Sequence, residues 1–436
     1  MRIYSFPRGG LSFDDPTAPQ KPPKNPVVNA FLPALSVVPL GDSIRRVHPL
    51  VSPGETVREG MLIGRASYQG AVNVHATVPG RVIRKVSWKD RDGLENDAIV
   101  IRMEGAFEKL GRKEEMLSWN GLSGYDLQRI ISEFGIVEME NSGRPLADMI
   151  SASRKENEKI TLVIRCVFDD PWLVADYALC RDRLKDVIEG ACIVAKACLK
   201  VSRIIFAVSH HEKELGERLL EAAGNLEFPF SLVLTGSRYP QRNNRELELA
   251  LRAYEKKEYF NFGSFLILGP AVFAAVADAV KYKKPILDRY VAVGGSAVKH
   301  PQIMKVRIGT RIGELIEQCG GFIEKPRRIT AGSPLSGREV MYLDEPVGKT
   351  CYAIAAMSKS QAALHGQQNC INCGECRAVC PIGLDPQNIY KRIKTLGVES
   401  AGTTNCHGCG CCKIVCPSAL PLSETILERN PEVMYV

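Results

Sequence analysis

The sequence contains no apolar run long enough to cross a bilayer, which takes about 20 consecutive residues. Its longest apolar stretch, residues 265–280, is interrupted by Gly269, Pro270 and Asp278. This stretch instead predicts a buried strand that leads into a helix. The opening residues, MRIYSFPRGG, lack the apolar core of a secretory signal peptide. We therefore expect neither a transmembrane segment nor an export signal.

The sequence also lacks any block of basic residues. The 57 Lys and Arg exceed the 49 Asp and Glu by 8, but they are spread thinly and are not interleaved with aromatic residues. A nucleic-acid-binding surface would show both features, so the composition argues against nucleic acid as a partner. A mildly basic surface remains compatible with an acidic redox partner or an anionic membrane face.

Disulfide-like spacing is absent from seven of the 15 cysteines, which suits a reducing cytoplasm. One of them lies beside Cys412, inside a motif that does not use it, and is expected to serve packing or to be a spare thiol. The seven are Cys166, Cys180, Cys192, Cys198, Cys319, Cys351 and Cys411.

The other eight cysteines form two runs of C-x2-C-x2-C-x3-C, each followed at once by a proline, Pro381 or Pro417. This is the bacterial ferredoxin pattern for two [4Fe–4S] clusters, in which the fourth Cys of each run ligates the other cluster. A zinc site would use two pairs of ligands instead. The first predicted ligand set is Cys370, Cys373, Cys376 and Cys416. The second is Cys406, Cys409, Cys412 and Cys380. The sequence thus predicts one-electron transfer.

Short strands with period-two alternation follow a Pro-rich leader that ends near Pro26. Turns at Pro53-Gly54 and Pro79-Gly80 indicate a small β-sandwich built from hairpins. It resembles the lipoyl/biotinyl barrel-sandwich hybrid, but the expected hairpin tip, residues 73–76, has no lysine to carry a swinging arm. His75 in that tip is expected to be a surface or packing residue rather than a ligand.

From about residue 121 the pattern changes to alternating strands and helices. Apolar strands separated by helices predict a largely parallel sheet covered on both faces, which often binds a nucleotide or flavin at the strand ends. His210 and His211 fall in one such strand-end loop and are expected to be exposed loop residues. The expected strands are 160–165, 203–209, 230–235 and 265–269, and the expected helices lie around 173–199, 212–224, 245–256 and 271–281.

Two smaller units follow. Residues from about 300 to 350 read as a strand, a short helix that ends at Gly320-Gly321, and a return strand. After each cysteine run comes a short helix, in LDPQNIYKRI and in ALPLSETIL, which is the internal repeat expected of a ferredoxin fold.

This order of modules resembles the C subunit of the Rnf electron-transport complex over nearly the whole chain. The most specific segments are INCGECRAVCPIGLDPQ and NCHGCGCCKIVCPSALPL. The resemblance implies a multidomain α/β and α+β fold with five parts. They are a leader (1–30), a barrel-sandwich hybrid (31–105), an α/β domain like the complex I flavin subunit (120–298), an SLBB-type β-grasp unit (299–350) and a two-[4Fe–4S] module (362–425).

In that family the α/β domain binds FMN and NADH through a loop of the form GIVGxGGAGFPT, whose bare backbone can approach phosphate closely. The matching segment 135–146 keeps the frame but carries Glu138, Glu140 and Asn141 where the family has glycine. Two carboxylates would repel a pyrophosphate and occupy its space.

Three further family loops are altered in the same direction. The acidic NGAECEPY-like loop has Phe168 in place of its first Glu, and the YPQGGE loop, here residues 239–244, has lost both glycines. The NVGT turn, whose Asn would meet the flavin, begins with Gly269. We therefore predict that this chain does not bind FMN and NADH in the family manner.

The resemblance implies an iron–sulfur electron conduit docked peripherally on the cytoplasmic face of the cell membrane. Its partners would be the other Rnf-type subunits and a ferredoxin or other soluble redox protein. Three alternatives remain open. They are an NADH:FMN dehydrogenase with a divergent pocket, an α/β domain that serves only as a docking scaffold, and a soluble ferredoxin-like reductase.

Overall fold

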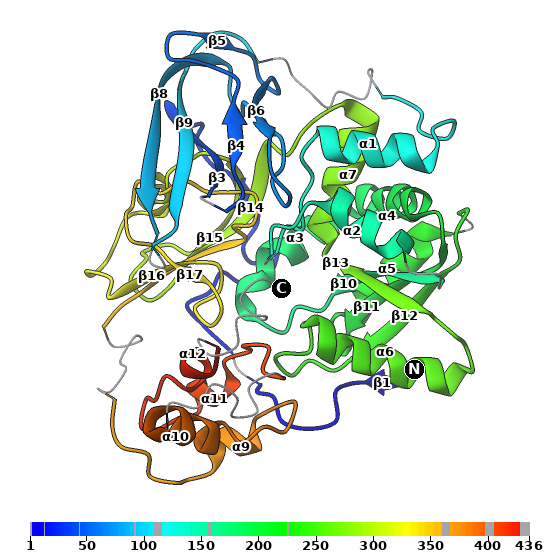
Figure 1. Cartoon of the computed structure of the whole chain (residues 1–436), viewed down its shortest axis with the longest axis vertical. Helices are drawn as coiled ribbons and strands as arrows, with labels where there is room; N and C mark the ends of the chain where they lie inside the picture. Colours follow the sequence, from blue (N-terminus) through cyan, green and yellow to red (C-terminus); the bar gives the residue numbers. More distant parts are fainter. Residues whose placement is uncertain are drawn as a thin grey trace.

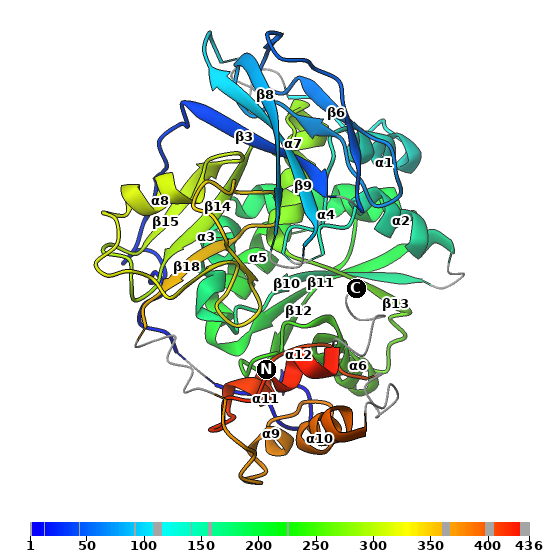
Figure 2. The ribbon, with the colours of Figure 1, turned by 60° about the vertical axis from the view of Figure 1, so that its left-hand side comes forward.

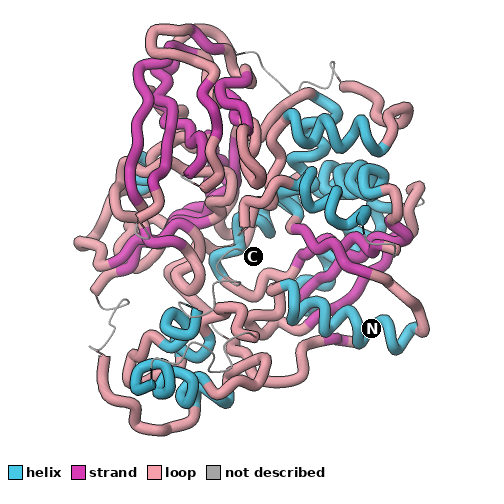
Figure 3. Tube along the Cα trace, in the orientation of Figure 1, coloured by secondary structure: helices cyan, strands magenta, loops and turns pink. Residues whose placement is uncertain are grey.

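The computed structural model places a β-rich barrel at one end of the molecule and a small helical module at the other, with an α/β domain and a second β unit between them (Figures 1 and 2). Figure 3 shows how the strands gather in the barrel and how the helices gather around the central sheet. The structure describes residues 2–12, 14–42, 44–90, 93–107, 116–140, 142–155, 159–224, 226–359, 367–396 and 405–427.

The α/β domain is built on a five-stranded sheet in which every neighbouring pair is parallel, in the order β1-β12-β11-β10-β13. All seven residues of β10 are buried, because alternate side chains meet helices on opposite faces of the sheet. The predicted parallel sheet is confirmed. Its strands are β1 (Ile3–Tyr4), β10 (Ile160–Cys166), β11 (Val201–Ser209), β12 (Phe230–Thr235) and β13 (Ser264–Leu268).

Helices cover both faces of this sheet. One face carries the largest apolar core of the chain, and α6 packs Leu247 and Leu251 on the other. The single helix expected over 173–199 is two helices, because Arg183 leaves the helical conformation and pairs with Asp278 at 2.7 Å. The helices are α1 (Gly124–Glu133), α2 (Leu146–Lys155), α3 (Val174–Asp182), α4 (Leu184–Cys198), α5 (Lys213–Ala223), α6 (Asn244–Glu258) and α7 (Pro270–Tyr282). Two short 3-10 turns are η2 (Pro171–Leu173) and η3 (His210–Glu212).

The barrel consists of two small antiparallel sheets, β3-β9-β8-β5 and β4-β6-β7. Their facing side chains form one apolar core that includes Val38, Ile63 and Ile99. The predicted barrel-sandwich hybrid is thus confirmed. Its strands are β3 (Leu35–Asp42), β4 (Val47–Pro49), β5 (Thr56–Val57), β6 (Leu62–Ala66), β7 (Val74–His75), β8 (Gly80–Lys89) and β9 (Glu95–Met103).

A six-stranded mixed sheet, β17-β16-β18-β14-β15-β2, forms the second β unit, with helix α8 (Ile312–Gln318) packed on it. The strand, helix and return strand expected after residue 300 are β15, α8 and β16. The strands are β2 (Val27–Asn29), β14 (Asp288–Gly294), β15 (Gln302–Arg307), β16 (Arg328–Ala331), β17 (Arg338–Glu339) and β18 (Ala353–Met357).

The leader joins three parts of the molecule. Its β1 forms the edge of the parallel sheet and its β2 pairs with β15 in the mixed sheet. Between them, the Gly10 backbone N–H donates to the carbonyl of Val379, at 2.9 Å, in the helical module. The side chain of Phe6 is fully buried. The leader therefore contributes one strand to each of two sheets and also contacts the helical module.

In the helical module, each cysteine run contains a one-turn helix and is followed by a second helix. The helices are α9 (Glu375–Ala378), α10 (Pro386–Leu396), α11 (Cys411–Ile414) and α12 (Leu422–Leu427). The helices expected after each run are α10 and α12, and they pack on each other. None of the helices in the described part of the chain combines the length and apolarity that a bilayer crossing requires.

Candidate functional site

The two cysteine runs adopt the same local backbone. Asn372 and Gly408, each two residues after the first Cys of its run, have φ values of 60° and 73°. Gly374 and Gly410 have φ values of 81° and 76°, and each precedes a one-turn helix. Left-handed residues at matching positions let each run wrap its own first three thiols around one centre. The repeat seen in the sequence is therefore also a repeat of conformation.

The fold brings the fourth Cys of each run towards the other run. Cys380 lines a small hollow together with Cys406, Cys409 and Cys412. The additional thiol, Cys411, is fully buried and lines the same hollow.

The first run has a corresponding apolar cluster. It contains Cys376 and Cys412 and has Cys370 and Cys416 packed against it. In the described part of the chain no three His, Cys, Asp or Glu side chains converge as the ligands of one metal ion would. Two runs of four thiols, one of which lines a hollow, are a donor set that fits iron–sulfur clusters.

The second run is docked on the α/β domain. His407 Nε2 lies 2.8 Å from a carboxylate oxygen of Glu246, which is fully buried on α6. The Tyr239 hydroxyl donates to the carbonyl of Cys409 at 2.7 Å, and Arg245 donates to the carbonyl of Asn405 at 3.2 Å. The altered YPQGGE-like loop and the start of α6 therefore form the contact with the second run.

The segment expected to be a phosphate loop folds onto itself. A bridge joins Val137 to Pro145, and the Glu138 N–H donates to the Arg144 carbonyl at 2.8 Å. The Glu138 carboxylate accepts from the N–H groups of Glu140 and Ser142, at 2.9 and 2.7 Å. Glu138 thus binds the backbone N–H groups that a phosphate would need. Asn141 lies outside the described residues.

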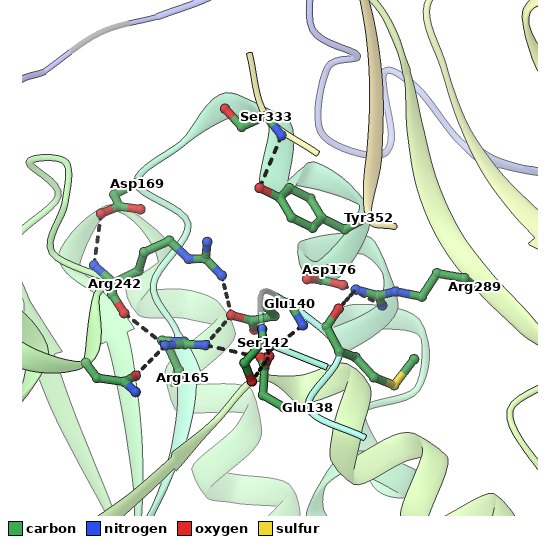
Figure 4. A network of polar contacts seen from close by, with 12 residues as sticks. Glu138, Glu140, Ser142, Arg165, Asp169, Asp176, Arg242, Arg289, Ser333 and Tyr352 are labelled. Atoms are coloured by element: carbon green, nitrogen blue, oxygen red, sulfur yellow. Dashed lines mark hydrogen bonds and ion pairs between the residues drawn. The ribbon is translucent and has the colours of Figure 1, made fainter. Parts of the chain in front are cut away.

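Glu140 is the centre of a buried ionic network (Figure 4). One of its carboxylate oxygens pairs with both Arg165 and Arg242. Burial alone would raise the pKa of Glu140, but the two guanidinium groups outweigh it and hold the pKa below its usual range. Arg165 also donates to the carbonyl of Arg242 and to Asn244, at 3.1 and 2.7 Å. The Glu140 carboxylate is therefore charged, and one of its oxygens is held by two arginines.

One more ion pair and one backbone hydrogen bond extend the network. Arg289, fully buried, lies 2.8 Å from Asp176 and donates to the Met139 carbonyl at 3.1 Å. Asp169 accepts from the Arg242 N–H at 2.9 Å, and burial raises the pKa of Asp169 to about 7 against the attraction of the Arg242 charge. Arg289 and Asp176 thus pair their charges, whereas Asp169 is held by a backbone N–H group and burial disfavours its charged form.

Gly269 lies directly against this network. A Cβ at position 269 would come 1.6 Å from Oε1 of Glu140, so the carboxylate occupies the space of the missing side chain. Positions 140 and 269, both expected to line the FMN and NADH pocket, do lie together. The Glu140 carboxylate, however, fills the space beside Gly269. The large cavity at the strand ends, about 840 Å³, is lined instead by Ser12, by leader residues 14–16 and 18–24, and by Phe168–Pro171 with a few neighbours.

The histidines mostly behave as expected. His75 is buried and stacks on Phe134, with ring centroids 5.9 Å apart, so it is a packing residue. Burial, and to a lesser degree the Lys349 charge, lower the pKa of His75 to about 3. His211 is exposed at the strand-end cavity, whereas His210 is half-buried and bonds the Thr235 carbonyl at 3.2 Å. No sequence pattern pointed to His407, because its partner Glu246 is 161 residues away and reads as an ordinary helix residue.

Comparisons with known proteins agree with this architecture. Four family models match in chain order. They are the RnfC barrel sandwich hybrid domain (residues 8–106), the Nuo51 FMN-binding domain (131–258), the SLBB domain (290–344) and a 4Fe-4S dicluster domain (362–419). The predicted fold class and the presence of an iron–sulfur domain are confirmed.

Relatives match over most of the chain. The C subunit of the ion-translocating oxidoreductase complex of Rhodobacter capsulatus is 29% identical over 375 residues, which are 85% of this chain and 72% of the relative. The C subunit of the Na(+)-translocating ferredoxin:NAD(+) oxidoreductase complex of Acetobacterium woodii is 27% identical over 353 residues, 78% and 77% of the two chains. A solved chain of an NAD+-reducing [NiFe]-hydrogenase superposes with a TM-score of 0.45 at 12% identity, over 66% of this chain and 52% of that one, which is too remote to support an inference. By the order of its modules and by these relatives, the chain is similar over most of its length to the C subunits of Rnf-type ion-translocating oxidoreductase complexes.

Proposed function

We propose that the chain is the peripheral iron–sulfur subunit of an Rnf-type membrane complex and passes single electrons through two [4Fe–4S] clusters. The observation that carries the proposal is the conformational repeat of the two cysteine runs, with the fourth Cys of each run turned towards the other. The named relatives, which are subunits of ion-translocating complexes, support the assignment to such a complex.

The proposed ligand sets are crossed between the runs, as the spacing predicts. When bound, such clusters supply one-electron transfer. The chain's own contribution is to hold the thiolates and to tune them through nearby N–H donors. The Leu384 N–H, for example, donates to the Cys380 sulfur at 3.3 Å. One set is Cys370, Cys373, Cys376 and Cys416, and the other is Cys406, Cys409, Cys412 and Cys380.

The α/β domain, in this proposal, has lost the family's FMN and NADH site. Glu138 binds the N–H groups of its own loop, and Glu140 fills the space beside Gly269. A flavin at that place would have to displace a charge that two buried arginines hold, so binding would also break the network. The domain would then serve to position the cluster module through Tyr239 and Glu246.

Attachment to the membrane, in this proposal, is indirect and on the cytoplasmic face, through other subunits of the complex. The described part of the chain contributes no membrane-crossing helix. Ion movement would belong to the partner subunits.

The test is the cofactor content of protein purified without oxygen. We expect about eight iron and eight acid-labile sulfide per chain, and no stoichiometric flavin. About four iron per chain would contradict the two-cluster proposal, and one FMN per chain would contradict the lost site.

A second candidate function is an NADH:FMN dehydrogenase with a divergent pocket. Two observations favour it, namely the match to the Nuo51 FMN-binding domain and the cavity of about 840 Å³ at the strand ends. None of the residues that line this cavity comes from segment 135–146 or 269–272, so the dehydrogenase would need a new mode of binding. NADH-dependent reduction of ferricyanide by the purified chain would establish this candidate in place of the first.

A further inference from the structure

The two cysteine runs have different surroundings. The second run faces the α/β domain, where Tyr239, Arg245 and Glu246 contact it. The first run turns its loop outwards, since Cys373 is exposed and the side chain of Ile371 is 65% exposed. The first run therefore offers a more exposed cysteine than the second, whose cysteines are half-buried or buried.

The exposed loop of the first run lies beside basic side chains. Lys391 on α10 donates to Asn372 Oδ1 at 2.6 Å, which places its ammonium group next to the loop. Lys394, one turn further, is exposed on the same side of α10, because residues three apart share a helix face. Arg377 on α9 is also exposed. In segment 367–396 the four cations Arg377, Lys391, Arg392 and Lys394 outnumber the two acids Glu375 and Asp385.

We propose that the Ile371–Cys373 loop and its basic rim, Arg377, Lys391 and Lys394, form the docking face for a soluble one-electron carrier with an acidic surface. This inference rests on the proposed function, because it needs a cluster in the first run. The loop presents one large exposed apolar side chain, Ile371, and Lys391 is bonded to the loop, with exposed Lys394 one turn further along α10 and exposed Arg377 on α9. That composition suits a small, transient, charge-steered contact of the kind formed by redox partners. A permanent interface between subunits would be larger and more apolar.

The experiment reverses the charge of the rim and compares it with an equal change elsewhere. The test variant is Lys391→Glu with Lys394→Glu. The matched control is Arg84→Glu with Lys89→Glu, two exposed cations on β8 at the opposite end of the molecule (Figure 1). Both variants change the net charge by the same amount, so long-range repulsion of an acidic probe is matched between them.

The probe is an oxidised ferredoxin of strongly negative net charge. Its dissociation constant is measured calorimetrically at several salt concentrations, and its reduced form is used for stopped-flow electron transfer. We expect the rim variant to bind about ten- to hundredfold more weakly than the control at low salt and to lose most of its salt dependence. Carbodiimide cross-links from the unmodified chain to probe carboxylates should map to Lys391 or Lys394.

The outcomes separate the two proposals. Iron-loaded protein in which rim and control variants bind the ferredoxin equally, or cross-links that map only elsewhere, would overturn the docking face and leave the proposed function standing. Protein without iron would overturn the proposed function and the docking face together. Iron content measured on each variant shows that the substitutions left the clusters in place.

Discussion

The contact between Gly269 and Glu140 makes a sharp prediction. Gly269 is the N-cap of α7 and has extended backbone angles, φ −78° and ψ 160°, that any residue can adopt. Alanine at this position therefore causes no backbone strain. Its Cβ would nevertheless lie 1.6 Å from Oε1 of Glu140. Gly269→Ala must push the carboxylate away from Arg165 and Arg242.

The size of the effect follows from the burial of these groups. Glu140, Arg165 and Arg242 are 4%, 5% and 6% exposed. Removing one partner of such a buried pair costs about 3–5 kcal/mol, because an uncompensated charge remains, and we expect this of Glu140→Ala. Displacing the carboxylate without removing it should cost about 2–4 kcal/mol. In the double variant the Cβ enters vacated space, so Gly269→Ala should then add about 1 kcal/mol or less, from the poorer cap.

The assay is urea unfolding of the four proteins, wild type, both single variants and the double. Fluorescence of Trp172, buried in the α/β domain, reports the transition. Hydrogen exchange of the β10 amides gives a local measure that does not require two-state unfolding of the whole chain. Gly121→Ala is the matched control, since no heavy atom lies within 4 Å of the added Cβ. Losses that simply add, with no coupling near 2 kcal/mol, would refute the contact.

The remaining predictions concern other parts of the molecule. Cys380→Ser should remove or alter the cluster of the second run, seen by EPR, and loss confined to the first run would show that the ligation is not crossed. His75 has a folded pKa of about 3 against 6.5 unfolded, so it binds fewer protons when folded and its contribution to stability falls as pH drops below 6.5. His75→Phe should lessen the acid loss by up to about 1.4 kcal/mol per pH unit between 6.5 and 3, and unchanged acid unfolding would contradict it. Tyr239→Phe removes the hydrogen bond to the Cys409 carbonyl, which is worth about 0.5–1.5 kcal/mol. The helical module should then detach more often from the α/β domain, and limited proteolysis should release it faster.

The elements with a strong local signal were predictable from the sequence. Strands β10 to β13 of the parallel sheet fall within a few residues of their expected bounds, because each is a short apolar run between helices, whereas the edge strand β1 was not predicted. The cysteine runs, their following helices and the barrel turns also carry local signals. The break at Arg183 was missed, since it depends on Asp278, 95 residues further along the chain.

The candidate site was predictable only in part. The sequence indicates that Glu138 and Glu140 are incompatible with a phosphate, but it does not say what compensates their charges. Arg165 and Arg242 lie 25 and 102 residues from Glu140. Neither belongs to a motif that predicts an ion pair. For the same reason the contact of Glu246 with His407 could not be predicted. Contacts between distant residues are set by the tertiary fold and leave no periodic pattern.

The leader's three contacts also have a consequence for folding during synthesis on the ribosome. Gly10 reaches Val379, and β1 pairs with β12, more than 200 residues later in the chain. At about 5–20 residues per second, the ribosome needs roughly 20–75 s to synthesise the chain between Gly10 and Val379. During that interval residues 3–10 have no final partner in the helical module. The contact between the leader and the helical module therefore forms only after residue 379 has been made, whereas β1 and Phe6 can already dock on β12 and on Arg238, which are synthesised about 140 residues earlier.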